Sequence, residues 1–160
     1  MGGIAKWRHY DQRDIKGVSG LDISTDKKNN MAAMRVLVVE GDKDVRQFIN
    51  ETLTQEGYEV VEADTAEQGL KAMHRSKERQ TIDVVLCNRQ VPSKSERDPL
   101  LQFLAERPSV PVVMLADHPD LHYATQMFRQ GVVDYLVKPI QSYALVDVVR
   151  HTITLHQGQK

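Results

Sequence analysis

The sequence predicts an α/β protein in which a doubly wound, five-stranded parallel sheet is covered by helices on both faces. Two observations lead to this fold class: five short apolar runs recur along the chain, and helical spacing of apolar residues follows each of them. Strands buried on both faces read as continuous apolar runs, and parallel neighbours need helical crossovers. With 160 residues, of which 41% are hydrophobic, the chain has the length of one such domain.

The first half of the pattern contains three strands and two helices. Strands are expected at residues 36–39, 58–61 and 82–87, where the runs are short and mostly apolar. Asp42 opens the first helix, which ends at Gly57, because Asp favours the cap and Gly favours the residue after a helix. Thr65 to Gln68 fits a capping box, so a second helix is expected to start there.

The second half repeats the alternation. Pro99 suits a first helical turn and follows a polar loop that spans residues 88–98. Further strands are expected at 110–115 and 132–137, with helices at about 119–130 and 143–155. Gly131 ends the fourth of the five helices.

Residues 1–34 differ from the rest of the chain. They contain a polar run at 24–30 and no clear apolar periodicity. We interpret them as a leader, a disordered tail or an artificially added segment, ahead of a domain over residues 35–160. An alternative is a docking segment anchored by Trp7 and Tyr10.

Composition excludes several function classes. The 21 basic and 22 acidic residues nearly cancel, which argues against direct nucleic-acid binding. No run approaches the ~18 apolar residues of a membrane helix, so no membrane partner is expected. A lone cysteine, Cys87, and the lack of a cleavable signal indicate a reducing compartment, and we expect a cytoplasmic protein. Cys87 itself is interpreted as a small core residue.

The candidate site residues are those that follow the strands, at the edge where such folds bind ligands. They are Glu40, Gly41 and Asp42 after the first strand, Asn88 after the third, Ala116 and Asp117 after the fourth, and Lys138-Pro139 after the fifth. No G-x-G-x-x-G follows the first strand, which argues against a dinucleotide module.

From about Arg35 to His156 the chain resembles the response-regulator receiver domain, the phospho-accepting module of two-component signalling. The resemblance rests on RVLVVEGD (35–42), QEGYEV (55–60), PVVML (111–115) and, most specifically, GVVDYLVKP (131–139). It implies a flavodoxin-like (βα)5 fold with strand order 2-1-3-4-5. It also implies a phosphoryl site made of an Asp nucleophile, two further acids that hold Mg²⁺, a Ser or Thr, and a Lys.

At that implied site this chain departs from the family pattern. Glu40 keeps the first acid, but Gly41 stands at the second acid, Asn88 at the phospho-accepting Asp and Ala116 at the hydroxyl. Only Lys138 is intact. An amide is not a useful nucleophile toward phosphorus, and one carboxylate attracts Mg²⁺ poorly. We therefore expect a degenerate pseudo-receiver with no catalytic residue, no enzyme activity, no cofactor and no metal.

This reading makes the site a permanent internal contact. Lys138 is expected to face Glu40 and the Asn88 carbonyl, where the family has a switchable contact. The leading hypothesis is a phosphorylation-independent protein-interaction module in a signalling pathway. A second is a phospho-accepting receiver that uses a displaced carboxylate, Asp42 or Asp117, although Asp42 is expected to cap its helix. A third is a small-ligand or metal sensor that uses the vacated pocket or a histidine cluster.

That cluster is His118, Asp120 and His122, an H-x-D-x-H pattern of metal-ligand types. On a helix only the two histidines share a face, so exposed polar residues at a helix start are the favoured interpretation. In the loop after Asn88, Ser95 and Glu96 lie in the stretch where receivers usually have a Gly, a few residues after the position of Pro92. We interpret residues 93–98 as a solvated, adaptable surface.

Receivers carry a switch aromatic on the last strand, and Tyr135 stands at that position. The resemblance also implies a partner surface on the last two helices and the last strand. In this chain it would offer His122, Gln126, Arg129, Asp134, Arg150 and His151. We expect either a protein partner or a homodimer there, with a mixed polar face as the alternative.

Overall fold

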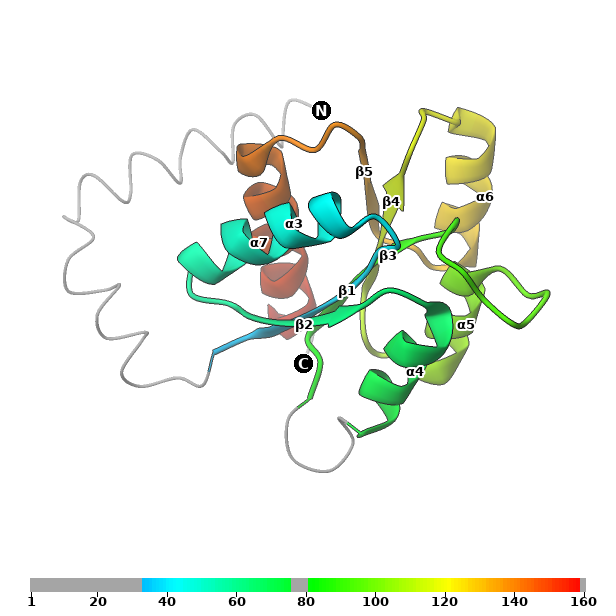
Figure 1. Ribbon diagram of the computed structural model, residues 1–160, viewed down its shortest axis with the longest axis horizontal. Coiled ribbons are helices and arrows are strands. Elements are labelled where there is room, and N and C mark those ends of the chain that lie inside the picture. Colours follow the sequence, from blue (N-terminus) through cyan, green and yellow to red (C-terminus); the bar gives the residue numbers. More distant parts are fainter. Residues whose placement is uncertain (1–32, 76–80, 159–160) are drawn as a thin grey trace, which may run out of the picture. The chain divides into compact units, whose positions relative to one another are not determined.

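The computed structural model describes residues 33–75 and 81–158. These residues form the predicted α/β fold, with a parallel sheet. Within them five strands pair in the order β2-β1-β3-β4-β5, every pair parallel (Figure 1). The strands are β1 (Arg35–Val39), β2 (Glu59–Ala63), β3 (Val84–Asn88), β4 (Val112–Ala116) and β5 (Asp134–Val137). The helices are α3 (Lys43–Gln55), α4 (Ala66–Arg75), α5 (Pro99–Glu106), α6 (Leu121–Gln130) and α7 (Ser142–Gly158). The predicted class and strand order are confirmed.

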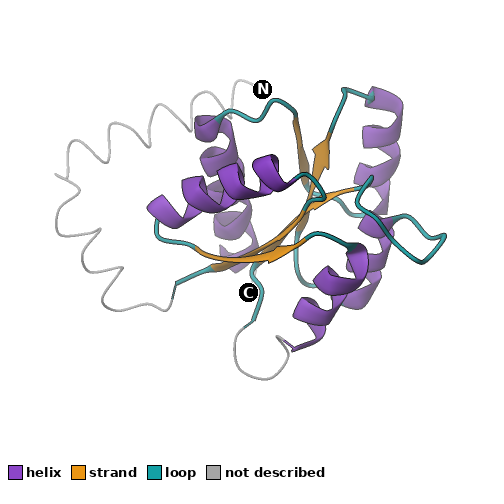
Figure 2. Cartoon of the chain, viewed as in Figure 1, coloured by secondary structure: helices purple, strands orange, loops and turns teal. Residues whose placement is uncertain are grey.

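Helices cover both faces of the sheet, as Figure 2 shows. On one face α3 and α7 pack through Ile49, Leu53, Leu145 and Val149 against strand residues such as Val38. On the other face α4, α5 and α6 supply a second cluster, which includes Met73, Phe103 and Met127. The middle strands β1 and β3 are buried on both faces, which explains their continuous apolar runs.

The predicted helix boundaries rest on contacts that the structure shows. The Asp42 carboxylate accepts hydrogen bonds from the backbone N–H groups of Asp44 (2.9 Å) and Val45 (3.2 Å), so Asp42 caps α3. Pro99 lies in the first turn of α5. Gly57 and Gly131 have positive φ angles of 96° and 122°, the left-handed conformation that ends helices and favours glycine.

Some boundaries differ from the prediction for identifiable reasons. Asn88 is the last residue of β3 rather than the first of a loop, because it pairs with Leu115 of β4. Val132 lies outside β5, because its N–H bonds to Met127 at the end of α6 and is not available to the sheet. The helix expected from residue 119 begins at Leu121, because Asp120 is its N-cap.

The predicted tail, residues 1–34, lies outside the described residues apart from its last two, and so do Trp7 and Tyr10. Among the helices that the structure describes, none combines the length and apolar character needed to cross a membrane.

Candidate functional site

The strand register brings the predicted site residues to one edge of the sheet. Val39 pairs with Cys87, and Ala116 pairs with Val137, so the residues that follow these strands end side by side. The Lys138 N–H donates to the Ala116 carbonyl (2.9 Å), which extends the pairing of β4 and β5 by one step. Glu40, Asn88, Asp117 and Lys138 therefore converge, although up to 98 positions separate them in the chain.

Lys138 is bound by two carboxylates. Its Nζ lies 2.8 Å from Glu40 Oε1 and 2.8 Å from Asp117 Oδ1. The Asn88 amide nitrogen donates to the same two oxygens, at 3.2 Å to Glu40 and 2.9 Å to Asp117. One ammonium and one amide thus share two acceptors. We call Glu40, Asn88, Asp117 and Lys138 the strand-end network.

The second carboxylate oxygen of Glu40 and the side-chain oxygen of Asn88 are bound as well. Glu40 Oε2 accepts from the Asp42 N–H (2.9 Å), and the Asn88 side-chain oxygen accepts from the Gln90 N–H (2.9 Å). The expected contact between Lys138 and the Asn88 carbonyl is therefore not found among the described residues. Asp117, which follows β4, takes the place that the prediction gave to Asn88 as the second partner of Lys138.

Electrostatics follow this arrangement. The hydrogen bond from Lys138, helped by the one from Asn88, lowers the pKa of Asp117. Partial burial disfavours the Lys138 ammonium, but its bonds to Asp117 and Glu40 prevail and raise its pKa. Glu40 and Asn88 are only 2% and 3% exposed, so their partners replace water almost entirely.

The backbone beneath Glu40 is held as well. The Glu40 N–H donates to Ala63 of β2 (3.0 Å), and Arg46 of α3 donates to the Glu40 carbonyl (2.7 Å). Gly41 is exposed, and a Cβ added there would lie 3.4 Å from Pro92 Cδ, an ordinary contact. The structure therefore has room for a side chain at position 41, so steric crowding does not explain why a glycine stands there.

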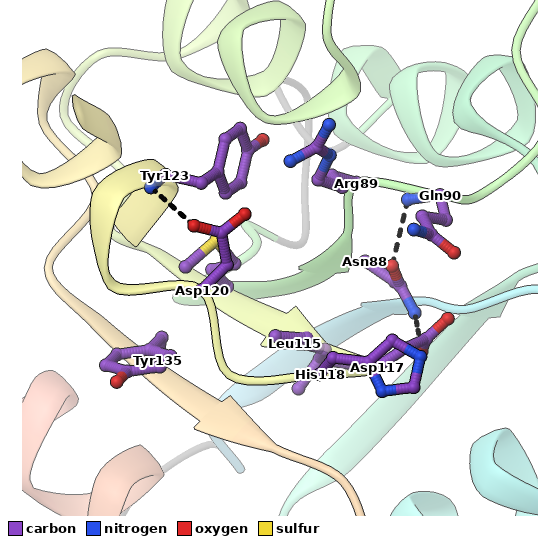
Figure 3. A pocket seen from close by; sticks show the side chains of 11 residues that line it. Asn88, Arg89, Gln90, Leu115, Asp117, His118, Asp120, Tyr123 and Tyr135 are labelled. Atoms are coloured by element: carbon purple, nitrogen blue, oxygen red, sulfur yellow. Dashed lines mark hydrogen bonds between the residues drawn. The ribbon is translucent and has the colours of Figure 1, made fainter. Parts of the chain in front are cut away.

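A pocket of about 120 Å³ opens beside the network, between the loops that follow β3 and β4 (Figure 3). Ala116 lines it, together with Tyr123 and Tyr135. The Arg89 guanidinium lies 3.8 Å from the centre of the Tyr123 ring, and the Tyr123 hydroxyl donates to Asp98. Burial and this bond raise the pKa of Tyr123 well above its usual value.

The histidine cluster is not assembled as a metal site. Asp120 caps α6 by accepting from the Tyr123 N–H (3.0 Å), and His122 Nε2 lies 3.3 Å from the Gln126 amide. Within residues 33–75 and 81–158 no group of three or more His, Cys, Asp or Glu is placed to hold a metal ion. Cys87 is fully buried, and desolvation raises its thiol pKa well above the usual value.

The residues of the predicted partner surface lie on α6, β5 and α7. His122, Gln126 and Arg129 are exposed on α6. Asp134 is half-buried on β5; burial raises its pKa, while His151 of α7 acts in the opposite direction. Arg150 is half-buried on α7 and contacts Glu56 at the end of α3 (3.5 Å), so its place in that surface stays a prediction. Tyr135 is half-buried and packs edge-on against Phe128, with ring centres 5.9 Å apart.

Comparisons with known proteins agree with this architecture. The family model described as "Response regulator receiver domain" matches residues 36–150. The chain is similar to the response regulator protein FleR of Pseudomonas aeruginosa, with 32% identity over 122 residues, covering 76% of this chain and 25% of FleR. It is also 32% identical to the two-component response regulator-like protein APRR7 of Arabidopsis thaliana over 124 residues, covering 76% of this chain and 17% of APRR7.

Solved structures give the same result. A response regulator receiver domain protein from Clostridium thermocellum superposes with a TM-score of 0.71 at 26% identity, over 79% of this chain and 99% of that one. Of FleR, by contrast, this chain spans about a quarter, so the similarity to the longer regulators concerns a single part of them.

Proposed function

Because this chain belongs to the response regulator receiver family, we propose that it works in signal transduction as a phosphorylation-independent protein-interaction module, a pseudo-receiver without enzyme activity. One observation carries the proposal. Asn88 ends β3 with an amide, and the neighbouring Lys138 is already neutralised by two carboxylates of the same chain. An amide has no ionised oxygen to attack phosphorus.

The geometry also does not suit the Mg²⁺ that the family resemblance implies. A magnesium site needs several oxygen ligands in octahedral arrangement, commonly including carboxylates. Glu40 is the buried carboxylate at this edge, and its two oxygens already accept from Lys138, Asn88 and the Asp42 N–H. Asp42 is committed to capping α3. A divalent cation would have to displace the Lys138 ammonium.

The test is phosphorylation of the purified chain by a small phosphodonor, acetyl phosphate with Mg²⁺, followed by intact mass measurement. We expect no phosphoryl adduct. A wild-type protein whose intact mass shows no adduct supports the proposal. An acyl phosphate mapped by peptide analysis overturns it. An adduct on Asp42 or on Asp117 would identify the displaced-carboxylate alternative. Of these two side chains, Asp117 is the one that contacts Lys138.

A matched variant tests in a second assay whether the Mg²⁺ site of the family can be restored. Gly41→Asp combined with Asn88→Asp adds two carboxylates beside Glu40, and the space around Gly41 admits the new side chain. We expect this variant to melt at a higher temperature when Mg²⁺ is added, because the cation relieves repulsion between crowded carboxylates. The wild type should show no such rise.

We further propose that the surface for protein contacts lies on α6 and the segment that leads into β5, which is one part of the surface of the last two helices and last strand that the family resemblance implied. Three apolar side chains are exposed there: Leu121 (75%), Phe128 (42%) and Val133 (40%). Exposed apolar groups with a polar surround are typical of interaction sites. If the partner is a second copy, light scattering will show concentration-dependent dimers that Leu121→Glu abolishes. A wild type that stays monomeric throughout excludes self-association.

A further inference from the structure

The loop between β4 and α6 is bound to its surroundings by the side chain of its first residue. Asp117 Oδ1 accepts from Lys138 Nζ (2.8 Å) and from the Asn88 amide (2.9 Å). These donors stand at the ends of β5 and β3, on either side of β4. A single carboxylate oxygen therefore connects the loop to both neighbouring strands (Figure 3 shows the Asn88 contact).

The other end of the same loop is held by a different set of contacts. Tyr123, in the first turn of α6, donates its hydroxyl to Asp98 Oδ2, while Asp98 Oδ1 caps α5 by accepting from the Leu100 N–H (2.9 Å). Arg89 stacks on the Tyr123 ring from the loop that follows β3. Residues 117–123 are thus fixed at their start by Asp117 and at their end by Tyr123.

Donor chemistry explains why a carboxylate belongs at the first of these positions. A lysine ammonium and an amide N–H₂ that point at one spot form a small anion site, since both donate and one carries positive charge. The partner that fills it here is covalently part of the chain, so it is present at a high effective concentration and pays no cost of association. Ala116 next to it provides no side-chain donor or acceptor.

We propose that Asp117 is a built-in ligand of the anion site formed by Lys138 and Asn88, and that it holds the β4–α6 loop and the start of α6 in one conformation. The inference rests on the proposed function, for which it supplies the mode of regulation. The surface of α6 is presented constantly, because the contact that fixes the loop needs no added group. An external anion is excluded as long as Asp117 stays bound.

Removal of this carboxylate should free the loop and open the anion site. In Asp117→Ala the missing group has the size of formate, so added formate can occupy the position between Lys138 and Asn88. Asp117→Asn keeps an acceptor oxygen but removes the charge, and charged acceptors form the stronger hydrogen bonds. Asp64→Ala is the matched control, since Asp64 is an exposed carboxylate that follows β2 at the same edge of the sheet.

The experiment is backbone amide NMR with hydrogen exchange on the whole chain. In Asp117→Ala we expect amides of residues 117–123 to exchange about tenfold faster or more, in line with the loss of a charge-assisted hydrogen bond. Formate should reverse the change, whereas chloride at equal ionic strength should not. In Asp117→Asn the exchange rates of these amides should lie between those of the wild type and Asp117→Ala. In Asp64→Ala they should match the wild type.

Two results would overturn the inference: unchanged exchange in residues 117–123 of both Asp117 variants, or an exchange increase that formate does not reverse. If Asp117→Ala does not fold, Asp117→Asn decides by the first criterion. Neither result touches the proposed function, which depends on whether the wild type accepts a phosphoryl group. An acyl phosphate on the wild type would overturn the proposed function even where the loop responds as expected.

Discussion

Removal of the Lys138 ammonium is the perturbation that the strand-end network makes most informative. Lys138→Met keeps most of the aliphatic stem and deletes the charge, while Lys138→Ala deletes both. In either variant Glu40 and Asp117 face each other without the cation that lies 2.8 Å from both. Two negative charges then remain next to Asn88, whose amide can donate to both but carries no charge.

The size of the effect follows from burial. Removal of one partner from a buried ion pair typically costs about 3–5 kcal/mol, because the other charge stays desolvated. Glu40 is 2% exposed and fits that case, but it keeps hydrogen bonds from Asn88 and the Asp42 N–H. The Asp117 side chain is 33% exposed, so water screens its share. We expect about 3 kcal/mol, which corresponds to a fall of about 10 °C in Tm for a domain of this size.

The assay is urea and thermal unfolding of the two Lys138 variants beside Lys71→Met, an exposed lysine on α4 that serves as the control. Lys71→Met should stay within about 0.5 kcal/mol of the wild type. Glu40→Gln added to Lys138→Met should recover part of the loss, because the buried charge is then gone. A Lys138→Met variant as stable as the control would refute the reasoning, since the network would then contribute nothing.

Further predictions concern pH, the Tyr123 contact and a close approach at Gly69. The pKa of Asp117 is lowered, so its contribution to the free energy of unfolding is present above about pH 4 and is lost as pH falls through its folded-state pKa. The pKa of Lys138 is raised, so its contribution is present below about pH 10 and is lost as pH rises through its folded-state pKa. The Tm difference between wild type and Lys138→Met should therefore be constant from about pH 5 to 9 and shrink outside that range. Tyr123→Phe removes the hydroxyl that donates to Asp98 and should lower the free energy of unfolding by about 1 kcal/mol in urea titrations. An unchanged urea midpoint would show that this hydrogen bond does not stabilise the fold. Gly69→Ala places a Cβ 2.6 Å from Phe103 Cζ and should destabilise by about 1–3 kcal/mol despite the better helix propensity of alanine; a stabilised variant would show that Phe103 can move.

Most of the fold was accessible from the sequence because local and global signals agree. The apolar runs of β1 and β3 are buried on both faces, and Asp42 and Pro99 begin helices as their chemistry favours. Once a parallel sheet is assumed, the carboxyl ends of its strands must share an edge. The sequence alone therefore predicts that Glu40 and Lys138 lie close together.

What the sequence left undetermined depends on loop backbones and on side-chain choice. Asp117 was identified as a strand-end carboxylate, but only the turn after β4 directs it toward Lys138 rather than outward. The Asn88 amide faces Asp117 because its oxygen is taken by the Gln90 N–H. Arg150 pairs with Glu56 across α7 and α3, a contact 94 positions apart that no periodicity encodes. Such pairs are decided by tertiary packing.

The most direct test of the central claim is an amide NMR spectrum of the wild type before and after addition of Mg²⁺ and then beryllofluoride, a mimic of an acyl phosphate. We predict that the resonances of Glu40, Asn88 and Lys138 stay in place. Asp117 is already paired with the Lys138 ammonium, and Asn88 has no carboxylate that could bind beryllofluoride. Concerted shifts of these resonances together with those of Tyr135 and α7 would contradict the account, since the site would then still bind the mimic and transmit it to the last helix.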